Sequence, residues 1–299
     1  QLADLAGTAG DAGSRKHWLE ELVAAAGASG SERSVWLAAH ASLELARPLD
    51  DATRSVRLAV PLDRSLAAKK TAMEASLSAY ARAAGYGVAE VTTAATYAMA
   101  DLYRDLGRSL LESERPPGLS AEELEQYGLL LEEQAYPFEE KAIGIHADNA
   151  HRAVNGVYDQ WVRRSFAALA EMNPARYDRD ETLELPAVAV AVPAATATTP
   201  TVDVTPALAA ARTTLESGDA QAAAKQAEAA LAIDPVNPAG LNALGVARRQ
   251  LGQFPEARAA YERAIAADPT YAAPRRNCGV LFDLYLGDPA ATAIYAGPE

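Results

Sequence analysis

The chain has 299 residues, of which 49% are hydrophobic and 22% charged, and its formal net charge is −13. This length fits about two domains, and the composition is ordinary for a globular protein. The acidic balance argues against nucleic acid as the main partner, because binding phosphates requires a basic surface, and a local basic patch is the alternative. The sequence has no long apolar run that would form a membrane-spanning helix, and its single cysteine excludes a disulfide framework.

The N-terminal part of the chain predicts a domain of long helices. Gln1 is not a start methionine and residues 1–14 are rich in Gly and Ala, so we expect a processed or trimmed chain with a frayed leader. Apolar residues then recur at helical spacing in two segments, the second of which we expect to stop near Pro48. Two longer apolar stripes within 62–110 meet at Gly85-Tyr86-Gly87, which predicts an antiparallel helical hairpin.

A second group of signals predicts two more helices in this domain. Ser120 and Glu123 have the spacing of a capping box, which marks a helix start. Pro137 suits the first turn of a further long helix, which we expect to run to Leu169. The glutamates between 112 and 140 would give one end of the domain a negative field that steers a basic partner. The alternative is that they only keep an Ala-rich surface soluble.

Candidate catalytic and metal-binding residues are few. His146 and His151 are five residues apart, which puts them about 140° apart around a helix instead of on one face. A di-iron bundle needs Glu-x-x-His, but Ile143 stands three residues before His146. We therefore expect solvated or interface histidines, no metal site and no cofactor. Adjacent glutamates such as Glu139 and Glu140 point to different helix faces, so we expect a solvated acidic face and no catalytic carboxylate pair.

Between residues 184 and 205 the composition changes to Pro, Ala, Thr and Val, without signals that start or stop a helix. Such a composition is typical of an interdomain linker. Val and Ala alternate within it, so a short edge strand is the alternative interpretation. The predicted organisation is an N-terminal helical domain over 1–183, this linker, and a repeat module over 206–299.

Small residues and a proline recur in the C-terminal module with a constant offset: Gly218, Ala223, Ala230 and Pro235 return as Gly252, Ala257, Ala264 and Pro269. An offset of this length, about 34 residues, is typical of a solenoid of helix-turn-helix units. Gly245 is small where two helix axes should approach closely, and Gly252 suits a turn that needs a left-handed residue. Cys278 lies inside the pattern, so we expect it to be a small core residue.

The module resembles the tetratricopeptide repeat (TPR) family over residues 204–299. Its middle repeat carries the residue types of the family motif: Leu244-Gly245, Gly252, Ala257, Tyr261, Ala264 and Pro269. Arg248 departs from the motif, since the family usually has Tyr there. The resemblance implies an all-α fold, with an α-solenoid of TPR helix-turn-helix repeats preceded by a long-helix, divergent TPR-like domain.

The resemblance also implies where a partner binds, because the inner face of the first helix of each TPR holds an extended or helical peptide. The positions that match this face are partner-binding candidates: Asn242, Val246, Arg249, Gln250, Arg276, Val280 and Asp283. Certain TPR domains grip a C-terminal carboxylate, but Ala243 and Ala273 stand where such a clamp needs polar residues. We therefore do not expect a chaperone-tail function. The alternative is that the repeats only stack on further repeats or on the N-terminal domain.

The leading hypothesis is a non-enzymatic scaffold or adaptor that binds a protein partner on the concave TPR face. The segment from Leu284 to Pro289 and the high alanine content resemble bacterial TPR proteins of envelope assemblies. This resemblance implies a location in the periplasm or at the outer membrane, with the cytoplasm as the alternative. A rival is an N-terminal helical enzyme, or a ligand- or metal-binding domain, with an appended TPR targeting arm. A third is self-assembly through the last repeat, which has a longer turn and stops near Tyr295.

Overall fold

The computed structural model describes residues 2–179, 181, 183 and 203–295, and the regular elements among them are all helices. This confirms the all-α fold class. Contacts divide the chain into two units, Gln1–Arg152 with Val157–Ala175, and Ala153–Gly156 with Arg176–Glu299. In the part of the chain that the structure describes, none of the helices combines the length and the apolar character needed to cross a bilayer.

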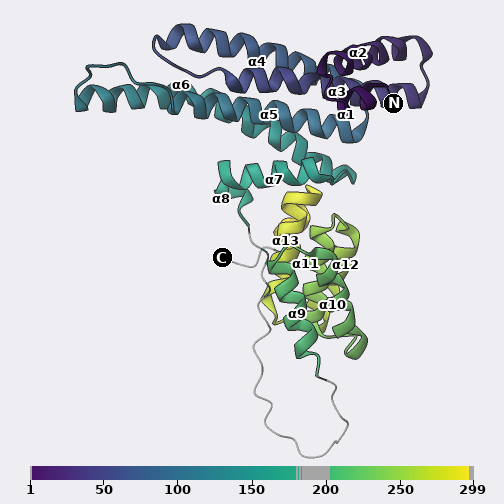
Figure 1. Ribbon diagram of the computed structural model, residues 1–299. Helices are drawn as coiled ribbons and strands as arrows, with labels where there is room; N and C mark the ends of the chain where they lie inside the picture. The colour runs from purple at the N-terminus through teal and green to yellow at the C-terminus, as the bar shows by residue number, and fades with distance from the viewer. Residues whose placement is uncertain (1, 180, 182, 184–202, 296–299) are drawn as a thin grey trace, which may run out of the picture. The chain divides into compact units, whose positions relative to one another are not determined.

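The first unit is built from antiparallel helices. They are α1 (Leu2–Thr8), α2 (Ala12–Ser29), α3 (Glu32–Ser55), α4 (Leu62–Ala84), α5 (Ala89–Leu111), α6 (Ala121–Ala150) and α7 (Gln160–Met172). Two short helices, η1 (His151–Asn155) and α8 (Pro174–Tyr177), lie where the division between the units falls in the sequence. Figure 1 shows α3 beside α4 and α5 beside α6. The core lies between α3, α4 and α5, where Met73, Tyr80 and Leu102 are buried. The predicted hairpin break at Gly85–Gly87 and the capping box of Ser120 and Glu123 are both confirmed.

Two helix boundaries predicted from prolines in this unit were wrong: the stop near Pro48 and the start at Pro137. The prediction of a frayed leader was also wrong. α3 continues through Pro48, and α6 continues through Pro137 without a new start. A proline inside a helix removes one backbone hydrogen bond, whereas the flanking turns here bury apolar surface. Ala135 and Ala142, for example, are at most 1% exposed on either side of Pro137. The N-terminal residues fold into α1, and α6 ends at Ala150 instead of running to Leu169.

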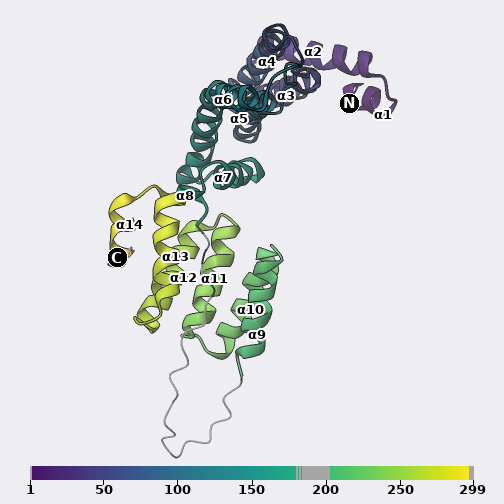
Figure 2. The ribbon, with the colours of Figure 1, turned by 90° about the vertical axis from the view of Figure 1, so that its left-hand side faces the viewer.

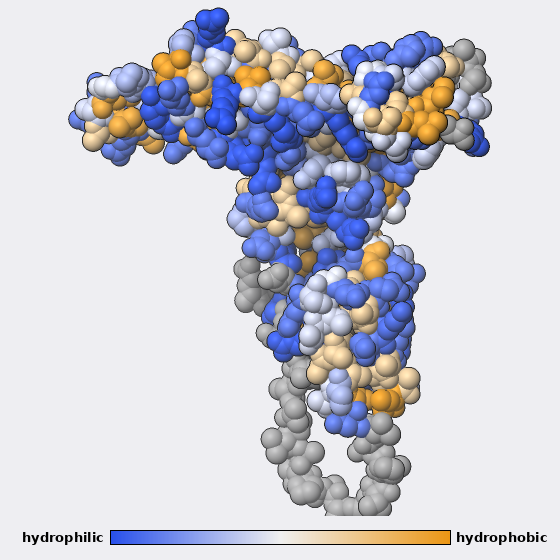
Figure 3. All heavy atoms as spheres, in the orientation of Figure 1, coloured by the Kyte–Doolittle hydropathy of each residue, from blue (hydrophilic) through white to orange (hydrophobic). Residues whose placement is uncertain are grey.

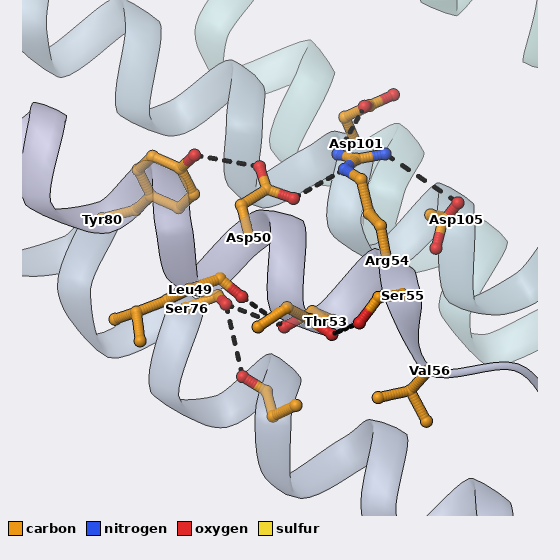
Figure 4. A network of polar contacts seen from close by, with 12 residues as sticks. Leu49, Asp50, Thr53, Arg54, Ser55, Val56, Ser76, Tyr80, Asp101 and Asp105 are labelled. Carbon is orange, nitrogen blue, oxygen red and sulfur yellow. Dashed lines mark hydrogen bonds and ion pairs between the residues drawn. The ribbon is translucent and has the colours of Figure 1, made fainter. Parts of the chain in front are cut away.

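A network of charges ties α3 to α4 and α5 (Figure 4). Arg54 on α3 contacts Asp50 at 2.6 Å and Asp101 of α5 at 2.8 Å. Tyr80 of α4 donates its hydroxyl hydrogen to Asp50 at 2.9 Å. Burial alone would lower the pKa of the Arg54 guanidinium, but the two carboxylates raise it above its ordinary value. Because each charge has a partner of opposite sign, the network holds three helices in register.

Among its described residues, the second unit contains three successive helix pairs, which Figure 2 shows side by side. They are α9 (Thr205–Glu216) with α10 (Ala220–Ile233), α11 (Pro238–Gln250) with α12 (Phe254–Ala267), and α13 (Ala272–Val280) continued by η2 (Leu281–Leu286) with α14 (Pro289–Tyr295). The turn of each pair holds a glycine with positive φ: Gly218 at 83°, Gly252 at 77° and Gly287 at 60°. The repeat prediction is therefore confirmed at its turns. Most of the predicted linker, including the alternative edge strand, lies outside the described residues, and the division into three parts stays a prediction.

The two helices of the middle pair approach closely at Gly245. A Cβ added to Gly245 would lie 2.3 Å from the ring of Tyr261, which is 0% exposed. Real Cβ atoms do not come that close to other heavy atoms, so only glycine allows the ring to sit there. Cys278 is likewise 0% exposed, as predicted, and burial raises the pKa of its thiol to about 12.

The third pair contains one extra residue, and the structure shows where it goes. Gly279 follows Gly245 by one repeat period, but the turn glycine Gly287 follows Gly252 by one residue more than that period. Between them, Leu281–Leu286 form a π-helical turn. A π turn takes up one residue more than an α turn, so the insertion is absorbed within the helix and not in the turn, where it was expected.

Two tyrosines near the end of the last repeat contact other aromatic rings of the chain. Tyr285 is 8% exposed and its ring lies 5.3 Å from that of Phe254. The ring of Tyr295 stacks on Phe282 at 5.5 Å. Ile294 of α14 nevertheless stays 74% exposed, and self-assembly through this end stays a prediction.

The close approach at Gly245 makes a testable prediction. Gly245→Ala should destabilise the second unit by about 1–3 kcal/mol, because the ring of Tyr261 must move. Amide hydrogen exchange in α11 and α12 measures this as faster opening. The matched control is Gly144→Ala in α6, where an added Cβ would meet nothing within 4 Å. That change should stabilise the first unit by up to about 1 kcal/mol. Unchanged exchange in α11 of Gly245→Ala would contradict the packing argument.

Candidate functional site

The candidate site is the inner face of the second unit, which we define as the side of α11, α13 and η2 that carries the predicted partner-binding residues. Asn242, Val246, Arg249 and Gln250 lie on α11, Arg276 and Val280 lie on α13, and Asp283 lies on η2. The structure thus brings them together on successive first helices of the repeats. Their side chains differ in exposure and in their neighbours.

Three of the predicted residues are buried beneath this face. Val246 is 2% and Val280 is 7% exposed, as expected for apolar positions between packed helices. Asn242 is 1% exposed and joins α11 to the next repeat. Its amide nitrogen donates to the Tyr271 hydroxyl at 3.2 Å, and its carbonyl oxygen accepts from Asn277 at 2.9 Å. These residues fix the spacing of the two first helices. Of the remaining candidates on these helices, Gln250 is half-buried and Arg276 is exposed.

Arg249 forms the chemical centre of the face, together with Tyr261 and Tyr285. We call these three residues the carboxylate pocket, because Arg249 and Tyr261 bind the carboxylate of Glu181 and Tyr285 contacts Arg249. Arg249 donates from Nε to one oxygen of Glu181 at 2.8 Å and also from a terminal nitrogen to the same oxygen. Tyr261 donates its hydroxyl hydrogen to the other oxygen at 2.6 Å. Both oxygens of this carboxylate are therefore bound.

The pocket shields these groups from water. The side chain of Glu181 is 3% exposed and that of Arg249 is 17% exposed. Arg249 also donates to the Tyr285 hydroxyl at 3.2 Å, with its guanidinium 5.3 Å from the centre of that ring. Burial opposes the charge of Arg249, yet the adjacent Glu181 holds its pKa well above the ordinary value. Burial and the same carboxylate raise the pKa of Tyr261. The pocket is thus a cation with two aromatic hydroxyls, arranged for a buried carboxylate.

A second charge contact lies one repeat further along the face. Asp283 on η2 lies 3.4 Å from Arg179 and 3.8 Å from Arg176. Arg179 and Glu181 are two residues apart, and they contact Asp283 and Arg249, which occupy equivalent positions in successive repeats. Arg179 and Glu181 thus present charges opposite in sign to those of the repeats they face.

Sequence reasoning missed Glu181 and the roles of the two tyrosine hydroxyls. Tyr261 matched the aromatic position of the repeat, which predicts packing only. Glu181 lay in the part expected to close the N-terminal domain, 68 residues before Arg249. The available signal was charge complementarity, since Arg179 and Glu181 match Asp283 and Arg249 in sign and order. Both residues belong to the same unit as the repeats.

A second polar cluster lies inside the first unit, around His146. This histidine is 0% exposed, so the expectation of a solvated or interface residue was wrong. The continuous α6 turns His146 toward α5 and α7, where its Nδ1 lies 3.3 Å from the hydroxyl of Ser165. Asn149 donates to the same hydroxyl at 2.9 Å and to the carbonyl oxygen of Thr93 at 3.2 Å. Burial lowers the pKa of His146 to about 4.

This cluster does not have the form of a catalytic or metal site. Ser165 is 0% exposed, so no substrate reaches its hydroxyl beside His146. Nε2 of His146 and Oδ1 of Asn149 find no hydrogen-bond partner among the described residues. Over the same residues no three His, Cys, Asp or Glu side chains come together as a metal-binding set. The cluster therefore joins α5, α6 and α7 as a neutral polar core.

An apolar groove in the first unit is a third candidate. It runs between α2 and α3, where its aliphatic lining includes Leu19, Val23 and Leu45. Figure 3 shows apolar side chains gathered over the α1–α2 end of this unit. Four of its lining charges pair with each other, Arg15 with Glu44 at 2.7 Å and Lys16 with Glu20 at 3.7 Å. The groove has no feature that selects an occupant, so the inner face is the better-defined site.

Comparison with protein families matches residues 245–283 to the family model described as TPR repeat. The match begins at Gly245, on the close approach to Tyr261, and ends at Asp283 on the inner face. It confirms that the second unit carries TPR repeats, as the motif residues indicated. A search of curated proteins gave no match.

The buried His146 predicts how the stability of the first unit depends on pH. Its pKa of about 4 lies below the unfolded value of 6.5, so the unfolded chain takes up a proton first as the pH falls. The free energy of unfolding should therefore fall between pH 6.5 and 4, by on the order of 3 kcal/mol from this group.

Tryptophan emission reports this unit, because Trp18, Trp36 and Trp161 all lie in it. Denaturant unfolding followed by this signal, at pH values across that window, measures the loss. His146→Gln should flatten the dependence, while His151→Gln, at an exposed position, should keep it. Equal slopes in wild type and His146→Gln would contradict this account.

Proposed function

We propose that the chain is a non-enzymatic adaptor that holds a segment of a protein partner on the inner face of its TPR unit. TPR repeats are protein-interaction modules in general, and the second unit carries them. One observation supports this particular face: Glu181, which lies outside any helix, already places its carboxylate in the carboxylate pocket. A surface that binds one such residue of its own chain has the chemistry to bind a partner's.

The groups of the inner face also suit a peptide ligand. Asn242 and Asn277 form a buried amide pair beneath it, which gives the face a fixed shape. Arg249 and Asp283 place one cation and one anion on successive repeats. The face therefore selects a segment by the order of the charges along it. Rigid support beneath charged groups lowers the entropy lost on binding.

Placement of this adaptor in a bacterial envelope assembly, in the periplasm or at the outer membrane, is part of the proposal and rests on the sequence resemblance alone. A protein that links components of an assembly needs one surface for each component. The inner face would supply one, and the acidic residues of the first unit would supply a second for a basic partner. Self-association through the last repeat would add a third.

A peptide selection tests the proposed face. Random peptides displayed on phage are panned against the full chain, and the affinities of the enriched peptides are measured by fluorescence anisotropy. Arg276→Glu, on the exposed part of α13, should weaken binding by about tenfold, which corresponds to roughly 1.4 kcal/mol. Arg263→Glu, at an exposed position on α12, is the matched charge reversal and should leave affinity unchanged. Enriched peptides that bind both variants as well as wild type would reject the inner face.

A further inference from the structure

We propose that Glu181 is a built-in competitor for the carboxylate pocket, and that the partner segment displacing it carries an acidic side chain two residues after a basic one. This inference rests on the proposed function and names both the ligand class and the regulation of the same face. The pocket is Arg249, Tyr261 and Tyr285, and its intramolecular ligand is Glu181, assisted by Arg179.

The pocket is built for a carboxylate and not for an apolar or neutral side chain. A buried ionised group is stable only when its charge is paired and its oxygens accept hydrogen bonds. Glu181 meets both conditions, since one oxygen accepts from Tyr261 at 2.6 Å and the other from Arg249 at 2.8 Å. A neutral ligand would leave the guanidinium of Arg249 buried without its counter-ion. An incoming segment must therefore bring its own carboxylate.

The spacing of charges sets the second requirement on that segment. Arg179 precedes Glu181 by two residues and lies 3.4 Å from Asp283. In an extended chain, residues i and i+2 point to the same side. A ligand with a cation and an anion at that spacing meets Asp283 and Arg249 together. In the same chain direction, the reversed order places like charges in contact.

The extra residue of the last repeat is tied to this site. Asp283 and Tyr285 both lie in the π-helical turn Leu281–Leu286. One residue changes the direction of the following side chains by about 100° around a helix. The insertion therefore sets which side chain reaches Arg249 from the neighbouring repeat, and the structure puts the Tyr285 hydroxyl there at 3.2 Å. π-turns inside helices are frequent at functional sites for this reason.

Competition follows from the covalent connection. Glu181 belongs to the same chain as the pocket, and the repeats that form the pocket begin further along that chain with α9 at Thr205. Tethering of this kind gives an effective local concentration in the millimolar range. A partner segment with the same contacts binds the face only to the extent that Glu181 leaves it. The apparent affinity of the chain for a partner is the intrinsic affinity multiplied by the fraction of molecules whose pocket is free.

A peptide supplied in trans tests this directly on the full chain. The probe is a fluorescent synthetic peptide with the sequence of residues 176–183, and anisotropy gives its affinity. Glu181→Gln in the chain weakens the internal contact, so this variant should bind the probe at least about tenfold more tightly than wild type. Adding Arg249→Gln should abolish the gain. Glu228→Gln breaks the contact of Arg248, the neighbour of Arg249, and should behave as wild type.

Each outcome decides a separate claim. Equal binding of the probe to wild type and Glu181→Gln overturns the competitor role. If wild type and Glu181→Gln bind the probe equally and Arg249→Gln weakens that binding, the pocket and the proposed function are retained, but Glu181 does not regulate them. If Glu181→Gln binds the probe tightly and adding Arg249→Gln does not change the affinity, the probe does not bind in the carboxylate pocket, and that part of the proposal is overturned. Absence of binding to every variant overturns the inference as a whole, while the peptide selection still decides the proposed function. A probe carrying Gln in place of Glu181 should fail to bind, and its full binding would reject carboxylate recognition.

Discussion

The ring of Tyr261 packed on Gly245 is the contact on which the fold and the site both depend. The absence of a side chain at Gly245 lets α11 and α12 approach until the ring is fully buried. That position carries the hydroxyl to the inner edge of the pair, where it meets Glu181. A residue type that a repeat uses for packing thereby becomes a binding group, because its hydroxyl reaches the carboxylate of Glu181 while its ring stays in the core.

The charges of the inner face depend on that frame. Arg249 would be unfavourable so far from water without a carboxylate, and Glu181 would be unfavourable without Arg249 and Tyr261. Glu181 belongs to the same unit as the repeats, although it precedes α9 in the sequence. In the proposed function, a face of this kind discriminates by charge order. It also resists ligands that cannot replace the carboxylate they displace.

Sequence reasoning predicted the features that recur with the repeat period or depend on local sequence signals. The repeat period located Gly218 and Gly252 in the turns of the first two helix pairs, since a left-handed turn needs glycine, and the capping box located the start of α6. It failed at Pro48, Pro137 and His146, where burial against neighbouring helices outweighs local preference. At the site, Arg249 and Asp283 could be predicted because their positions recur with the repeat. Glu181 could not, because its role depends on a contact across 68 residues that no period encodes.

A double-mutant cycle between Glu181 and Arg249 in the full chain tests the central claim most directly. The free energies of unfolding of the second unit in wild type, Glu181→Gln, Arg249→Gln and the double variant give the coupling of the two side chains, with amide exchange in α11 as the signal. A buried ion pair predicts a coupling of about 1–3 kcal/mol. A coupling near zero would show that Glu181 does not occupy the pocket in solution, and would contradict the account.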